Sequence, residues 1–176
     1  MKQTLIALVE DKPGVLNRVA SLFRRRNFNI ESLAVGHSET PGVSRMTIVT
    51  DEEEHLRRNV IRTNLLKMIN VIEVQDVTET PCVVRETALV KLAADAKTRG
   101  QVMDVVEMYR ARIVDVATDT LITEVTGESE KIESFIEVLR PFGIIEIMRT
   151  GKIAMTRGLV TPRSMASASN GANGQK

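Results

Sequence analysis

The segment Asp11-Lys12-Pro13-Gly14 has residue types that could bind a small anionic ligand. Pro13 suits the first position of a helix, where its missing N–H has no partner anyway. Gly14 has no Cβ, so a ligand can approach the backbone closely. The free N–H groups and positive dipole at a helix start favour a carboxylate, and no phosphate-loop pattern is present to favour a nucleotide. For this segment alone a plain Pro-Gly turn is the favoured alternative.

Asn29 is the second candidate for ligand binding, because it lies just before a predicted strand. A side-chain amide both donates and accepts hydrogen bonds, which suits the ammonium and carboxylate groups of an amino acid together. The alternative is an asparagine that only ends a helix or begins a strand, and for the residue alone this alternative is favoured. Neither candidate establishes a site without the rest of the chain.

Other reactive residue types lack the neighbours that catalysis or metal binding needs. His37 and His55 lie on different predicted elements without the spacing of metal ligands. Cys82 is the only cysteine and has no histidine near it in the sequence, which excludes an intramolecular disulfide and disfavours a nucleophile. The acidic residues 51–54 and the arginines 24–26 are best explained as solvated helix ends. We therefore expect no catalytic residue, no metal site and no bound cofactor in this chain.

The composition is that of an ordinary globular protein. The 176 residues carry a formal net charge of +1 and only 3% aromatic residues, which argues against nucleic acid or an anionic membrane as partner. No apolar run approaches the ~20 residues that a membrane-spanning helix needs, and the first residues lack a secretory signal pattern. We expect a cytoplasmic protein.

The elements that must hold the candidate residues follow the order β-α-β-β-α-β in the first half. Apolar residues recur at helical spacing from Val15 to Phe23, and Asn27 suits the left-handed position that ends a helix. A Pro41-Gly42 turn joins two alternating strands into a hairpin. The second helix is expected to bury Leu56, Val60, Ile61 and Leu65. The strands are predicted at residues 5–9, 30–35, 45–50 and 71–77, and the helices at residues 15–26 and about 53–68.

The second half repeats this order, so the fold class is α+β with two tandem ferredoxin-like βαββαβ domains. Residues 4–34 align without a gap with residues 87–117, whereas residues 66–74 align with residues 139–147. The second copy is therefore shorter, in the hairpin and second helix. The predicted domains are residues 1–78 and 79–160, followed by a low-complexity tail at residues 161–176.

The two copies differ at the candidate site. Where the first has Asp11 to Gly14, the second has Ala94-Asp95-Ala96-Lys97 and no Pro-Gly turn. We expect ligand binding in the first domain only.

Longer stretches of the chain resemble a known regulatory family. Residues 8–19 resemble the opening of an ACT domain, a small module that binds amino acids. Residues 28–33 and 44–49 are similar to the small subunit of acetolactate synthase (acetohydroxyacid synthase), and residues 85–91 and 127–132 are similar to the second domain of that family. The resemblance covers about residues 1–160.

The resemblance implies a homodimer in which two ACT sheets join side by side, with the effector valine at the interface. A carboxylate at Asp11, where the family often has asparagine, would either repel the ligand carboxylate or pair with its ammonium. The implied valine-binding residues are Asp11, Gly14, Val15 and Leu16 of one protomer with Asn29 and Ile30 of the other.

The resemblance also implies a non-catalytic role. The family's partner is a separate large subunit that uses thiamine diphosphate, FAD and Mg²⁺ to condense pyruvate with pyruvate or 2-oxobutyrate in branched-chain amino-acid biosynthesis. The small subunit activates that enzyme and confers feedback inhibition by valine. The alternative is a free-standing ACT regulator of another enzyme or of transcription.

Overall fold

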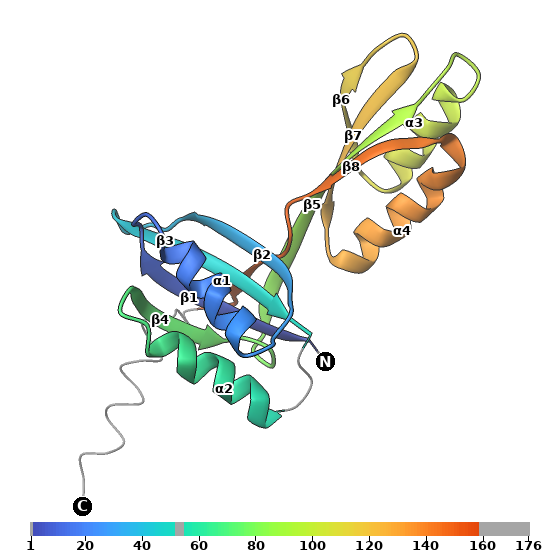
Figure 1. Ribbon diagram of the computed structural model, residues 1–176. Coiled ribbons are helices and arrows are strands. Elements are labelled where there is room, and N and C mark those ends of the chain that lie inside the picture. Colours follow the sequence, from blue (N-terminus) through green and yellow to red (C-terminus); the bar gives the residue numbers. More distant parts are fainter. Residues whose placement is uncertain (1, 52–54, 159–176) are drawn as a thin grey trace, which may run out of the picture. The chain divides into compact units, whose positions relative to one another are not determined.

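The computed structural model describes residues 2–51 and 55–158 and shows two α+β units (Figure 1). Unit 1 contains the chain up to Val83 and again from Ala154, and unit 2 contains Val84–Ile153. Each unit has helices on one face of an antiparallel sheet, which confirms the ferredoxin-like prediction. The segmentation into residues 1–78 and 79–160 stays a prediction, and the tail at 161–176 lies outside the described residues. No helix in this described part is long and apolar enough to span a membrane.

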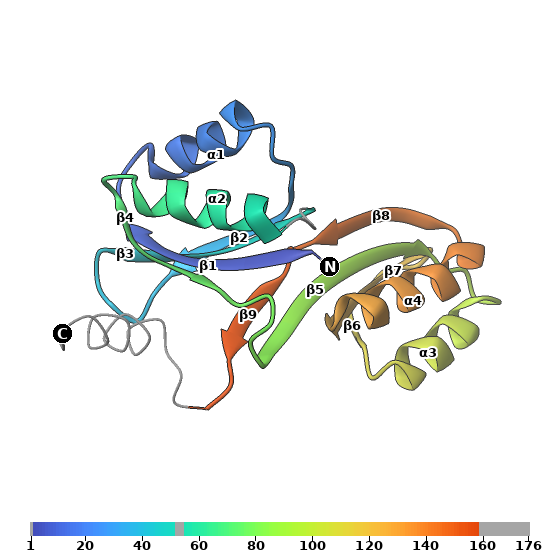
Figure 2. The same cartoon turned by 90° about the horizontal axis from the view of Figure 1, so that it is seen from below.

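Unit 1 is a four-stranded sheet with the order β2-β3-β1-β4 and two helices on one face (Figure 2). Strands β1 and β2 both pair antiparallel with β3, so they run in the same direction and β2 lies at an edge. The elements are β1 Gln3–Glu10, α1 Val15–Arg25, β2 Ile30–His37, β3 Val43–Thr50, α2 His55–Leu66 and β4 Val71–Asp76.

The core of unit 1 follows from the two-residue period of its strands and the period of about 3.6 residues in its helices. Alternate residues of β1 point toward the helices, and the α1 side chains of Val15, Val19 and Phe23 pack against these β1 residues. Helix α2 buries Ile61 and Leu65 completely. The expectation for the other half of its apolar face was wrong. Leu56 is 72% exposed and Val60 41%, because α2 presents a narrower stripe to the sheet than four apolar residues would fill.

The start of α1 differs from the expectation in one respect. The helix begins at Val15, so Pro13 lies in the preceding turn and not at the first helical position. The reason is Gly14, whose φ of 84° is left-handed and reverses the chain just before the helix. At the other end, Asn27 has φ 55° and ends the helix as predicted.

Unit 2 repeats the arrangement with the sheet order β6-β7-β5-β8. A further strand, β9, pairs with β5, and all of it except Ile153 belongs to unit 1. Strand β9 was not predicted. The core consists of alternate β5 residues packed against α3 and α4. The elements in the second half of the chain are β5 Cys82–Ala93, α3 Arg99–Met108, β6 Arg112–Val116, β7 Thr120–Gly127, α4 Ser129–Leu139, a short 3₁₀ helix Arg140–Phe142, β8 Ile144–Arg149 and β9 Ile153–Thr156.

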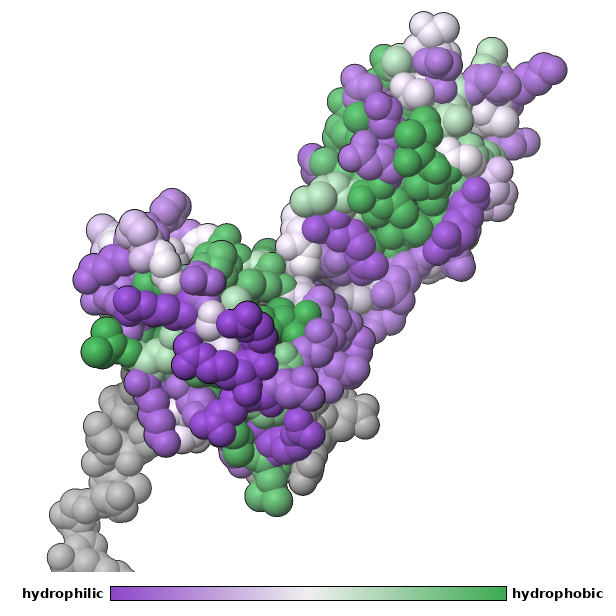
Figure 3. Space-filling view, viewed as in Figure 1, coloured by the Kyte–Doolittle hydropathy of each residue, from purple (hydrophilic) through white to green (hydrophobic). Residues whose placement is uncertain are grey.

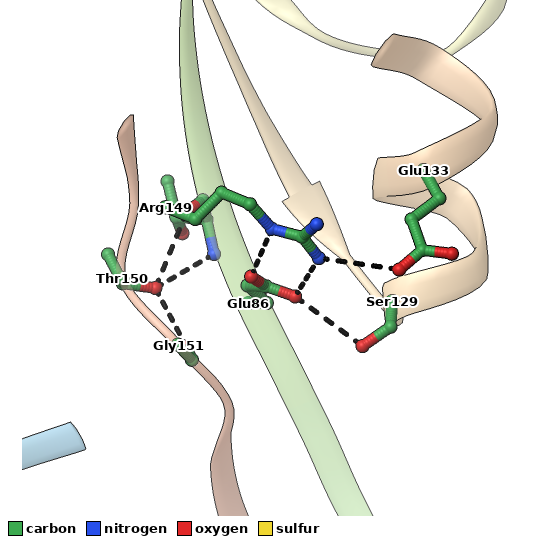
Figure 4. Close-up of polar contacts among 7 residues, drawn as sticks. Glu86, Ser129, Glu133, Arg149, Thr150 and Gly151 are labelled. Carbon is green, nitrogen blue, oxygen red and sulfur yellow. Dashed lines mark hydrogen bonds and ion pairs between the residues drawn. The ribbon is translucent and has the colours of Figure 1, made fainter. Parts of the chain in front are cut away.

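A partly buried ion pair between Glu86 and Arg149 joins strands β5 and β8 in unit 2 (Figure 4). The Arg149 Nε donates to Glu86 Oε1 at 2.6 Å and its Nη2 donates to Oε2 at 2.8 Å. Ser129 at the start of α4 donates to the same carboxylate at 3.4 Å, and Glu133 lies 3.8 Å from the guanidinium. The Arg149 hydrogen bonds outweigh the effect of burial and lower the pKa of the Glu86 carboxyl below its ordinary value.

The same positions carry a polar pair in unit 1. The Gln3 amide donates to Asp76 at 2.6 Å and to the Arg58 carbonyl at 3.2 Å. Both units therefore have a polar side-chain pair between equivalent strands, although the residue types differ: Gln3 with Asp76 in unit 1, and Glu86 with Arg149 in unit 2.

Candidate effector site at the first strand–helix turn

The turn after β1 presents unpaired backbone N–H groups to solvent. The first hydrogen bond of a full α-helical turn runs from Arg18 N to Gly14 O at 3.0 Å, and Val15 N donates to Lys12 O at 3.3 Å. Among residues 2–51 and 55–158, no side chain caps the start of α1. The N–H groups of Leu16 and Asn17 consequently have no protein acceptor within the described residues. An uncapped helix start of this kind favours an anion, above all a carboxylate.

The equivalent turn in unit 2 is closed by its own side chain. Asp95 Oδ1 accepts hydrogen bonds from Lys97 N, Thr98 N and Thr98 Oγ1, each at 2.9 Å. These bonds, that of the Thr98 backbone first, lower the pKa of the Asp95 carboxyl. Arg99 closes the turn further by donating to the Ala117 carbonyl at 2.6 Å. A built-in carboxylate thus occupies in unit 2 the place that is open in unit 1.

A polar network braces the open turn from below. Asn70, the residue before β4, donates to Glu10 Oε2 at 2.5 Å and accepts from Arg18 Nη1 at 2.6 Å. The Glu10 N–H donates to the Asn70 carbonyl at 2.9 Å, and Lys12 Nζ lies 3.1 Å from the Glu10 carboxylate. The Asn70 hydrogen bond, then that of Lys12, lowers the pKa of Glu10. Sequence reasoning missed Asn70, because nothing local links it to a turn 60 residues away.

His37 is a second residue that the sequence did not connect with the site. Its Nδ1 lies 3.3 Å from Asp11 Oδ2, with both side chains largely exposed. An exposed pair of this kind contributes at most about 1 kcal/mol to stability. The pair holds the end of β2 close to the candidate turn.

The six predicted effector residues fall into two groups. Asp11, Gly14 and Leu16 are exposed around the start of α1, whereas the Val15 side chain is 3% exposed and belongs to the core. Only the backbone of Val15 can therefore reach a ligand at the turn. Asn29 is exposed just before β2, and the first β2 residue, Ile30, is half-buried against the core.

One chain does not bring these two groups together. Ile30 pairs with Thr50, which pairs with Gln3 at the start of β1. The turn follows Glu10 at the other end of β1, ~23 Å away at about 3.3 Å per strand residue. A ligand in contact with both groups would have to lie between two copies of the chain.

Both halves of the chain match models of one family. Residues 5–73 match the model described as an AHAS small subunit-like ACT domain. Residues 85–158 match the model described as the small subunit of acetolactate synthase.

Individual relatives agree with the family models over nearly the whole chain. A probable acetolactate synthase small subunit of Archaeoglobus fulgidus is 49% identical over 90% of this chain and 98% of its own length. The acetolactate synthase small subunit of Bacillus subtilis is 45% identical over 90% of this chain and 92% of its own length. The crystal structure of the Thermotoga maritima small subunit superposes with a TM-score of 0.84 at 38% identity, over 91% of this chain and 99% of that chain. The chain therefore belongs to the acetolactate synthase small-subunit family, and its first half is an ACT domain.

Proposed function

We propose that this chain is the regulatory subunit that activates the catalytic large subunit of acetolactate synthase and makes that enzyme sensitive to valine. Membership of the small-subunit family supports the regulatory, non-catalytic role. The observation that carries the effector site is the contrast between the repeats: the helix start is open in unit 1, whereas Asp95 closes it in unit 2.

In this proposal the valine carboxylate accepts hydrogen bonds from the free N–H groups of Leu16 and Asn17 and is stabilised by the α1 dipole. The exposed Leu16 side chain and the Ile30 side chain of a second copy contact the isopropyl group. The Asn29 amide of that copy provides the remaining polar contact. Chemically, the site selects a small apolar amino acid over a nucleotide.

A homodimer through β2 would bring the two groups of residues together. Strand β2 is an eight-residue edge strand, and Val35 on it is 46% exposed, so its outer edge can pair with another strand. Two copies related by a two-fold axis would pair their β2 strands antiparallel. Pairing over the full strand places Ile30 of one copy beside His37 of the other, and His37 contacts Asp11. The turn of one copy and Asn29 of the other then face one ligand.

The partner in this proposal is the large subunit, with thiamine diphosphate, FAD and Mg²⁺ as its own cofactors and the cytoplasm as the location. Valine held between two copies changes how those copies pack, which alters the surface offered to the large subunit. A coupling free energy of about 1–3 kcal/mol is enough for useful inhibition.

The test is a calorimetric titration of the purified chain with valine, followed by an activity assay on mixing with the large subunit. We expect saturable valine binding and an increase in acetolactate synthesis that valine reverses. A free-standing ACT regulator would bind an amino acid and leave the large subunit unaffected, so activation separates the two functions.

A further inference from the structure

A groove of about 520 Å³ lies between α1 and α2 in unit 1. Three arginines, Arg18, Arg25 and Arg26, contribute to its walls, and Leu22 and Met68 contribute apolar surface. None of the described residues that line it is acidic. The groove is thus a local concentration of positive charge in a chain whose net charge is only +1.

The three arginines have no carboxylate partner within the described residues. Arg18 donates to the neutral Asn70 amide, and Arg26 donates to the Asn64 amide at 3.2 Å. Arg25 makes no side-chain hydrogen bond or ion pair in the described part of the chain. Guanidinium groups that are held by neutral amides, or by none, remain able to pair with incoming carboxylates.

The rim of the groove is apolar at one point. Ile69, in the turn between α2 and β4, is 92% exposed. Figure 3 shows mainly hydrophilic side chains across the α1 and α2 face, with apolar side chains at its edges. A small inorganic anion would use the arginines and leave Ile69 in water. A protein segment that carries carboxylates and an apolar side chain would use both, and arginine beside exposed apolar residues is typical of protein interfaces.

We infer that this groove binds an acidic segment of the catalytic large subunit, with an apolar side chain of that segment against Ile69. The inference rests on the proposed function, because it takes the large subunit as the partner. Because the groove is positively charged, the partner segment should be negatively charged. Because Ile69 is exposed, the segment should also carry an apolar side chain, which a small ion lacks.

Asn70 connects this groove to the effector turn. Its side chain accepts from Arg18 in the groove wall and donates to Glu10 below the turn. A partner carboxylate bound to Arg18 competes with the Asn70 oxygen for the guanidinium. Asn70 is then less firmly held, which weakens its hydrogen bond to Glu10 and so the support of the turn. By thermodynamic linkage, valine at the turn then changes affinity for the segment in the groove by the same factor.

The test compares two charge reversals in the last turn of α1, using the full-length chain and the purified large subunit. Arg25→Glu alters the groove. Arg24→Glu is the matched control, because Arg24 is exposed on the same turn, outside the groove lining, and its reversal changes the net charge equally. We expect Arg25→Glu to weaken binding of the large subunit by about tenfold or more, and Arg24→Glu to change it by no more than about twofold. Valine binding and melting temperature should be similar in the two variants.

The outcomes separate the inference from the proposed function. Absence of binding by the wild-type chain contradicts the proposed function itself. Binding by the wild type that both reversals weaken equally, or that neither weakens, overturns the groove assignment alone. A groove that binds inorganic phosphate, with phosphate binding lost in Arg25→Glu and large-subunit affinity unchanged, also overturns it.

Discussion

Substitutions of Gly14 can distinguish two properties of the turn: its left-handed backbone conformation and the absence of negative charge where the ligand carboxylate is proposed to bind. Gly14 has φ 84°, and an added Cβ would meet no atom within 4 Å. A side chain here therefore encounters only the left-handed penalty, about 1–2 kcal/mol for an ordinary L-residue and less for Asn or Asp. For a chain of 176 residues this lowers the melting temperature by roughly 2–8 °C. The fold should therefore survive both Gly14→Asn and Gly14→Asp.

Gly14→Asp adds a carboxylate where the ligand carboxylate is proposed to bind. Two like charges ~5 Å apart at an effective dielectric constant of about 20 repel by about 3 kcal/mol, roughly a two-hundredfold loss of affinity. Gly14→Asn is the matched control, since it has nearly the same shape and backbone tolerance without the charge.

Calorimetric valine titration and thermal unfolding of both variants measure the two effects. We expect Gly14→Asn to retain binding within about tenfold and Gly14→Asp to lose it, at similar melting temperatures. Equal losses in the two variants would refute the charge argument. Unaltered binding by Gly14→Asp would remove the turn from the site.

Three further predictions concern the Glu86–Arg149 ion pair, the edge strand β2, and Asn70 between the groove and the effector turn. Glu86→Gln should lower the free energy of unfolding by about 2 kcal/mol, because it breaks the partly buried, charge-assisted pair with Arg149. Since Arg149 lowers the Glu86 pKa, the wild-type stabilisation is complete above the ordinary pKa of about 4.3 and is lost as the pH falls through the lower folded-state pKa. Acid melting curves of the wild type and Glu86→Gln should therefore converge, and a constant gap would contradict this. Val35→Lys should shift light-scattering masses from dimer toward monomer by charging the β2 edge, and should weaken valine binding in parallel. Asn70→Ala should leave activation of the large subunit measurable and reduce its inhibition by valine severalfold, because the link between groove and turn is lost.

The fold was predictable where the pattern is local or repeated. The helical spacing from Val15 to Phe23 and the left-handed Asn27 can be read from a few neighbouring residues, and both are present. The repeat extended this to the second half, where β4 Val71–Asp76 and β8 Ile144–Arg149 occupy equivalent positions.

The errors arise where tertiary contacts decide. Apolar periodicity placed Leu56 and Val60 in the core, although only the sheet determines how wide a face of α2 it covers. Four-residue β9 is a strand only through its pairing with β5, which no local pattern shows. Asn70 and His37 contact the turn across 60 and 26 residues of chain, so their types gave no signal of that role.

Reconstitution of the large subunit with this chain, with acetolactate formation followed against valine concentration, tests whether the chain activates that enzyme and makes it sensitive to valine. We expect addition of the chain to raise activity and valine to lower it again in a saturable manner. Gly14→Asp should activate equally well but be insensitive to valine. Failure of the wild-type chain to raise activity, or activation that valine leaves unchanged, would contradict the proposed regulatory function.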